Sequence, residues 1–154
     1  ILDDDVPNGV NENDNELIRS WGKKTKFSFV PKDHVDLTNN HKLNFELGAK
    51  ISGSRFVVIK NDLALLERAL INFMLDTNIF KFGREEVSPP YIVNSKSLFG
   101  TGQLPKFKDD LFETDQDKWL IPTSEVPLTN IVRDEILNDS ELPLNFVAYS
   151  PCFR

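Results

Sequence analysis

Apolar residues recur every three or four positions between residues 63 and 74, a spacing that predicts the longest helix of the chain. Asn61 and Asp62 stand just before this stretch and provide an N-cap, and Gly83 provides a C-terminal stop. We therefore expect the helix to run to about Phe82, and at about 1.5 Å per residue it is roughly 30 Å long. The periodic residues are Leu63, Leu66, Leu70, Phe73 and Met74.

Short runs rich in β-branched and aromatic residues predict strands on both sides of this helix. The clearest is RFVVIK, and a second run is interrupted by Pro89-Pro90 and therefore suits an edge or a distorted strand. Helices and strands mix without a regular βαβ alternation, which favours an α+β fold with a mostly antiparallel sheet over a doubly wound fold. The predicted strands are 55–60, 85–93, 119–121 and 146–149.

Weaker patterns predict the remaining elements. Residues 1–15 are polar and suit a linker. Asn13 followed by Glu16 predicts a cap for a short helix that runs through Trp21 and ends at Gly22. Further expectations are a short strand at 27–30, two short helical stretches between 33 and 50, a loop at 100–105 and a helix at 127–137.

Composition limits the possible functions. The chain has 154 residues and a formal net charge of −6, which argues against nucleic-acid binding through a basic surface that covers the whole chain. An RNA partner would therefore have to bind a local basic patch or a part of the protein outside this segment. Hydrophobic residues make up 40% of the chain, enough for a real core, and no apolar run is long enough for a membrane span. Without an initiator Met or a signal peptide, and with an end inside an apolar run, we expect a segment cut at both ends.

Three tempting features do not support a function. His34 and His41 have no nearby cysteine or carboxylate at metal-ligand spacing, so no metal site is expected. Gly100-Thr101-Gly102 resembles half of a phosphate loop, but no Gly-Lys-Ser/Thr follows. Cys152 is the sole cysteine, which points weakly to a reducing compartment, and we expect it to be a small buried apolar residue rather than a nucleophile.

Residues 123–125 (Thr-Ser-Glu) lie between a hydrophobic strand and a helix start, where many sites are built on rigid supports. The Glu125 carboxylate could hold an ammonium group there, with the Thr123 hydroxyl orienting it. The alternative is that Ser124 or Glu125 merely caps the following helix, and local pattern alone favours this alternative because caps are so common.

An ordered set of motifs over essentially the whole chain resembles the seryl-tRNA synthetases, a class II aminoacyl-tRNA synthetase family. The loop GTGQLPKF at 100–107 and the segment PTSEVPLTN at 122–130 are the most specific members of the set. The resemblance implies an α+β class II fold, of which this chain is the first half of the catalytic domain. The other motifs are VPNG at 6–9, DN at 14–15, RSWG at 19–22, SGSRF at 52–56, LERAL at 66–70, PPY at 89–91 and PCFR at 151–154.

The resemblance also implies roles for individual residues. Thr123, Ser124 and Glu125 match the TxE loop, which embraces the α-amino group of L-serine. Ser124 stands where the family usually has alanine, a change we expect to be tolerated. Arg154 matches the first arginine of motif 2, which contacts the α-phosphate of ATP, and the start of motif 2 falls at 146–154. Motif 1 falls at about 63–93 and implies a homodimer.

The resemblance places other parts of the function outside this segment. Residues 1–15 would be a linker after an N-terminal coiled-coil arm that grips tRNA(Ser), and 16–154 the N-terminal half of the catalytic domain. The acidic Mg²⁺ ligands and the remaining arginines would follow Arg154, and no residue of this segment is assigned to catalysis. The expected activity is that of a cytoplasmic serine–tRNA ligase, which forms seryl-adenylate and then seryl-tRNA, and the 154 residues alone are expected to be inactive.

Two alternatives stay open at this stage. One is a non-ligase binding or regulatory dimer of the same fold, against which the retained Thr123, Glu125 and Arg154 argue. The other is a ligase that charges a carrier protein with serine, against which an upstream coiled-coil arm would argue. An organellar enzyme with an upstream transit peptide would have the same sequence over this segment.

Overall fold

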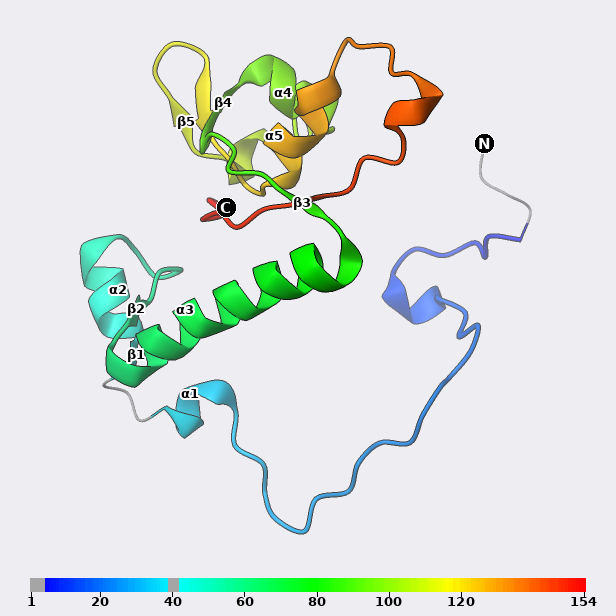
Figure 1. Cartoon of the computed structure of the whole chain (residues 1–154). Coiled ribbons are helices and arrows are strands. Elements are labelled where there is room, and N and C mark those ends of the chain that lie inside the picture. Colours follow the sequence, from blue (N-terminus) through cyan, green and yellow to red (C-terminus); the bar gives the residue numbers. More distant parts are fainter. Residues whose placement is uncertain (1–4, 39–41) are drawn as a thin grey trace. The chain divides into compact units, whose positions relative to one another are not determined.

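The computed structural model describes residues 5–38 and 42–154, and the chain divides into two units, Ile1–Leu37 and Thr38–Arg154 (Figure 1). Each unit is described by itself. Within the described ranges, no helix combines the length and the apolar character that crossing a bilayer requires.

The first unit contains little regular structure. Its elements are the 3-10 turn η1 (Glu12–Asp14), capped by Asn11, and the single-turn helix α1 (His34–Leu37), which starts where the Asp33 carboxylate accepts from the backbone of Val35 and Asp36. Among the described residues of this unit only Val35 is half-buried, and the others are exposed.

Two predictions for this unit are wrong. Residues 15–21 form no helix although one was expected to run through Trp21, the nearby turn η1 ends at Asp14, and residues 27–30 form no strand. Trp21 is 98% exposed, so this side chain has no core to pack against. A helix of so few residues is marginal in water without such packing, and local capping alone fixes just one turn.

The second unit begins with a small hairpin around a helix. Strand β1 (Leu43–Asn44) pairs antiparallel with β2 (Val58–Ile59), and helix α2 (Phe45–Ile51) lies between them in the chain. The strand expected at 55–60 is therefore confirmed only over its last part. Gly48 is buried in α2, and a Cβ there would stand 2.2 Å from the Phe56 carbonyl oxygen, so only glycine fits this approach.

The predicted long helix is confirmed as α3 (Asn61–Asp76), which continues into the π-helical turn η2 (Thr77–Lys81). Gly83 follows with φ +64°, a conformation that glycine adopts without strain. The N-cap prediction is wrong, because the capping residue is Lys60 and makes no side-chain cap bond. Asp62 instead accepts from Lys42 Nζ at 2.6 Å, which lowers the pKa of its carboxyl.

The core lies in a body built from short elements (Figure 1). Strand β6 (Lys118–Leu120) stands between β4 (Ile92–Asn94) and β5 (Glu113–Thr114), both antiparallel to it. Helices α4 (Ser95–Gly100) and α5 (Glu125–Thr129) supply further core residues. The buried apolar side chains are Val93, Leu98, Leu104, Trp119, Ile121 and Val126, with Leu111 packed against them.

A separate strand pair joins distant parts of the sequence. Strand β3 (Glu85–Glu86) pairs in parallel with β7 (Phe146–Val147), and Pro89-Pro90 separates β3 from β4. The predicted interruption of the 85–93 strand is thus confirmed, as is the α+β class with mostly antiparallel pairing. The helix expected at 127–137 is shorter and earlier, as α5 and the 3-10 turn η4 (Asn130–Val132). The other 3-10 turns are η3 (Lys108–Asp110) and η5 (Asp139–Glu141).

Candidate functional site

The Thr-Ser-Glu segment at 123–125 is held at both ends by buried residues. Ile121, just after β6, and Val126, in the first turn of α5, are both fully buried. Thr123 and Ser124 are half-buried and Glu125 is exposed. The segment therefore presents its carboxylate to solvent from a support that the core fixes in place.

Hydrogen bonds within the segment leave the Glu125 carboxylate available to a ligand. Thr123 Oγ1 accepts from the Glu125 backbone N–H at 3.3 Å, and Ser124, the N-cap of α5, makes no side-chain cap bond. Among the described residues, the Glu125 carboxylate has neither a hydrogen-bond nor an ion-pair partner. Ser124 therefore occupies the N-cap position of α5 without a side-chain cap bond, and Glu125 lies in the first turn of that helix with an exposed side chain.

Two contacts bring the last residues of the chain beside this segment. The Phe153 backbone N–H donates to the Ile121 carbonyl oxygen at 2.9 Å, and the hydroxyl oxygens of Ser124 and Ser150 are 2.5 Å apart. Arg154 follows Phe153 directly. The sequence-predicted serine-binding residues and the predicted ATP-binding arginine therefore lie on neighbouring segments at the end of β6.

Arg154 contacts the end of the GTGQLPKF loop. Its Nη2 lies 3.6 Å from Asp110 Oδ2, and its Cζ lies 5.3 Å from the centre of the Phe107 ring. The Arg154 side chain remains 57% exposed. An exposed guanidinium supported by an aromatic face and one carboxylate can still present its remaining donors to an anion.

The loop predicted at 100–105 is confirmed from Thr101 on, because Gly100 is the last residue of α4, and the core holds this loop in place. Leu104 is buried, and the Gln103 backbone N–H donates to the Leu98 carbonyl oxygen at 2.9 Å. One prediction nearby is wrong, because Cys152 is exposed. The neighbouring Phe153, whose backbone N–H is bonded to Ile121, is half-buried instead.

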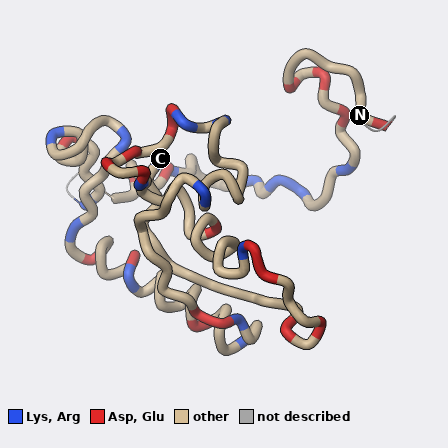
Figure 2. The backbone as a smooth tube through the Cα atoms, turned by 90° about the horizontal axis from the view of Figure 1, so that it is seen from above, with Lys and Arg blue, Asp and Glu red and all other residues tan. Residues whose placement is uncertain are grey.

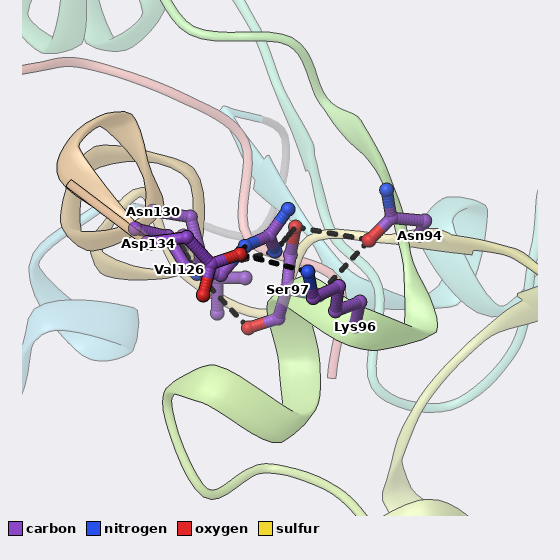
Figure 3. A network of polar contacts seen from close by, with 7 residues as sticks. Asn94, Lys96, Ser97, Val126, Asn130 and Asp134 are labelled. Atoms are coloured by element: carbon purple, nitrogen blue, oxygen red, sulfur yellow. Dashed lines mark hydrogen bonds and ion pairs between the residues drawn. The ribbon is translucent and has the colours of Figure 1, made fainter.

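A polar network missed by sequence reasoning joins α4 to α5 (Figure 3). The Asn130 amide donates to the carbonyl oxygens of Ser97, at 3.0 Å, and Val126, at 2.8 Å. Arg133 Nη1 donates to Asn130 Oδ1 at 2.8 Å and to Ser97 Oγ at 3.1 Å. The available signal was the position of Asn130 at the end of the PTSEVPLTN motif.

An exposed ion pair borders this network. Lys96 Nζ lies 2.7 Å from Asp134 Oδ2 and, with Arg133 nearby, lowers the pKa of the Asp134 carboxyl. Figure 2 shows basic and acidic positions spread along the tube. Across residues 5–38 and 42–154, no three His, Cys, Asp or Glu side chains are grouped for a metal ion, and His41 lies outside these ranges.

Comparison with known sequences agrees with the motifs. Residues 106–154 match the family described as tRNA synthetase class II core domain (G, H, P, S and T). The serine–tRNA ligase of Maricaulis maris is 54% identical over 151 residues, which are 97% of this chain and 36% of that protein. The serine–tRNA ligase of Cellvibrio japonicus is 56% identical over 154 residues, or 98% of this chain and 36% of that protein. The chain thus spans little more than a third of the length of these relatives.

Solved structures give the same result. Seryl-tRNA synthetase from Pyrococcus horikoshii, complexed with ATP, matches 83% of this chain and 29% of that chain, with a TM-score of 0.76 and 40% identity. Cytoplasmic serine–tRNA ligase from Naegleria fowleri, in complex with AMP, matches 100% of this chain and 37% of that chain, with a TM-score of 0.80 and 26% identity. The resemblance to seryl-tRNA synthetases and the class II fold are confirmed.

Proposed function

We propose that this chain is the first part of the catalytic domain of a serine–tRNA ligase, which activates L-serine with ATP and transfers it to tRNA(Ser). One observation carries the proposal. A core-anchored loop with an unpaired carboxylate, at Glu125, is hydrogen-bonded to the segment that ends in an exposed guanidinium, at Arg154. Amino-acid activation needs a partner for the substrate ammonium and cations for the phosphates, held close together.

The serine site in this proposal consists of Thr123, Ser124 and Glu125. The Glu125 carboxylate binds the substrate ammonium through a charge-assisted hydrogen bond. Thr123 fixes the backbone of Glu125 by accepting its N–H and keeps its own O–H free to donate. The Ser124 hydroxyl contacts Ser150, so Ser124 contributes to the site through its backbone and through this tether.

The nucleotide site in this proposal includes Arg154. A planar, permanently charged guanidinium can bond two oxygens of the ATP α-phosphate. The two similar structures are complexes with ATP and with AMP, which supports a nucleotide here. The remaining phosphate charge requires Mg²⁺ and cations from outside these residues, since the described part of the chain groups no carboxylates for a metal.

The assembly in this proposal is a homodimer formed through motif 1, at about 63–93. The apolar face of α3 supports it, because Leu66, Leu70 and Met74 are each about half exposed within the chain. The proposed domain bounds are 1–15 for the linker and 16–154 for the catalytic half. The proposed compartment is the cytoplasm, with an organellar form as the alternative.

The test uses the full-length protein and its serine-dependent ATP–pyrophosphate exchange. Glu125→Gln removes the charge that pairs with the ammonium, so serine binding should weaken by about 1.5–3 kcal/mol, roughly ten- to over a hundredfold, while the KM for ATP stays unchanged. Glu135→Gln makes the same substitution at an exposed position after the PTSEVPLTN motif. This variant is the matched control and should change neither the KM for serine nor the KM for ATP.

Three outcomes decide between the candidate functions. An unchanged serine requirement in the Glu125→Gln variant would exclude the assigned site. Absence of serine-dependent exchange in the wild-type protein would favour the non-ligase dimer. Exchange without charging of tRNA would favour a carrier-protein ligase. We expect the 154 residues alone to show no exchange, because they span little more than a third of the length of the relatives and their described part groups no carboxylates for a metal ion.

A further inference from the structure

Asn130 lies where the two most specific motifs of the chain meet. It ends the PTSEVPLTN segment, and it contacts α4, the helix that leads into the GTGQLPKF loop. We propose that Asn130 is a positioning residue for Glu125, and that α4 and the first residue of the loop hold the Asn130 side chain in place. The proposal rests on the proposed serine-binding role of Glu125 and concerns how that carboxylate is kept in place.

Helix α5, which carries Glu125, is too short to be stable without contacts to the rest of the structure. α5 has 5 residues, and a helix of one turn is unstable without tertiary support because nucleation is costly. Its last carbonyl groups also lack helical partners. Asn130 Nδ2 bonds one of them, the carbonyl of Val126, at 2.8 Å. Val126 is fully buried and directly follows Glu125, so this bond fixes the peptide between Val126 and Pro127, one residue beyond the proposed ammonium ligand.

The same amide group is fixed from the other side. Nδ2 also donates to the Ser97 carbonyl oxygen in α4, while Oδ1 accepts from Arg133 Nη1. Asn130 therefore uses both ends of its amide, and the guanidinium determines which end faces the two carbonyls. Ser97 is fixed in turn, because its N–H and its hydroxyl both donate to Asn94 Oδ1, at 3.0 and 3.1 Å (Figure 3).

The first glycine of the GTGQLPKF loop makes room for this contact. A Cβ on Gly100 would lie 3.1 Å from Asn130 Oδ1, closer than ordinary van der Waals contact. Gly100 does not have a positive φ, so its backbone conformation alone does not demand glycine. The residue that resembled part of a phosphate loop thus serves a different purpose, the close approach of α4 to the Asn130 side chain.

The arrangement separates the two proposed substrate sites. Arg154 belongs to the segment that is held by the bond between Phe153 and Ile121 and by the contact between Ser150 and Ser124, and neither of these involves Asn130, Ser97 or Arg133. Loosening Asn130 should therefore affect serine binding more than ATP binding. A residue that only stabilised the fold would affect both sites together.

The experiment compares three variants of the full-length protein in serine-dependent exchange. Asn130→Asp keeps the shape and the acceptor for Arg133 but loses both donors, so the KM for serine should rise about tenfold while the KM for ATP changes less than about twofold. Gly100→Ala, the milder variant, should raise the serine KM about threefold with the same selectivity. Thr129→Ala, at the exposed neighbouring position, is the control and should change neither constant.

Hydrogen exchange gives a readout that does not depend on the proposed activity. In Asn130→Asp, the backbone amides of Val126 and Leu128 should exchange at least about tenfold faster, while the amide of Phe153 should be unaffected. Equal rises in both KM values, or an unchanged serine KM with unchanged exchange at these amides, would overturn the positioning role. If the amides exchange faster in Asn130→Asp but the wild-type protein shows no serine-dependent activity, the support of α5 by Asn130 stands and the proposed function is refuted instead.

Discussion

Helix α3 and the body formed by residues 92–130 use apolar residues in opposite ways. α3 has 16 residues and the most regular pattern of the chain, yet none of its residues is buried. The body has helices of 5 and 6 residues and strands of 2 or 3, yet it holds all six buried apolar side chains of the described core. A regular apolar period therefore determines where a helix forms, whereas the burial of apolar side chains depends on how several short elements pack together.

The largest expected effect comes from a matched pair of leucines in the two regions. Leu98 in α4 is 0% exposed and Leu70 in α3 is 48% exposed. In the 154-residue chain, Leu98→Ala should lower the free energy of unfolding by about 2–5 kcal/mol, because it leaves a cavity in the core. Leu70→Ala should cost less than about 1 kcal/mol.

Urea unfolding followed by the fluorescence of Trp119, which is buried in the same core, measures both values. Equal losses would remove the distinction between the two regions. In the full-length protein, Leu70→Ala should instead increase the monomer fraction in sedimentation velocity if α3 forms the proposed dimer contact. A wild-type protein that is only monomeric at micromolar concentration would contradict that contact.

A smaller effect is expected at the helix starts. Asn94 caps α4 by accepting from the Ser97 N–H at 3.0 Å, whereas Lys60, the N-cap of α3, makes no side-chain cap bond. Asn94→Ala should therefore lower the free energy of unfolding by about 1 kcal/mol, while Lys60→Ala should stay within about 0.5 kcal/mol of the wild type. Thermal unfolding of the two variants tests this, and a larger loss for Lys60→Ala would contradict it.

The smallest effect concerns two exposed ion pairs, one at α3 and one at the edge of the body. Lys42 lowers the pKa of Asp62 at the start of α3, and Lys96 lowers the pKa of Asp134 beside the body. A lowered pKa means that each carboxylate favours the folded state above its ordinary pKa and loses that contribution as the pH falls through the lowered value. Lys42→Met and Lys96→Met should each raise the pKa of the partner carboxyl toward its ordinary value.

Carboxyl NMR titration of both variants measures these pKa values. The wild-type protein provides the reference, and the carboxyl of the other pair provides an internal control in each variant. Because both pairs are exposed, the pKa rise should be accompanied by little change in overall stability. An unchanged pKa of Asp134 in Lys96→Met would show that Arg133 alone keeps it low.

What the sequence could predict follows the same division. α3 was predictable because its periodicity is local, and the break at Pro89-Pro90 was predictable because proline removes a backbone donor. α4 was missed because Leu98 and Phe99 are adjacent and show no helical period, although Asn94 was a visible cap signal. The helix predicted to reach Trp21 failed because capping without burial does not extend a helix.

The candidate site divides similarly. Motif resemblance identified Thr123, Ser124, Glu125 and Arg154, and their roles stay proposals. Their placement on neighbouring segments depends on the bond between Phe153 and Ile121, which join residues 32 positions apart in the sequence and which no local pattern encodes. Asn130 was missed for the same reason, since its partner Ser97 lies in a different helix.

Gly48 limits which substitutions helix α2 can tolerate. Alanine is normally the better helix former, so most interior helical glycines can be replaced with a gain in stability. In α2 this preference is reversed, because the smallest added side chain would occupy the space of the Phe56 carbonyl group. Position 48 therefore accepts only glycine, so neutral substitutions in α2 are restricted to its other positions.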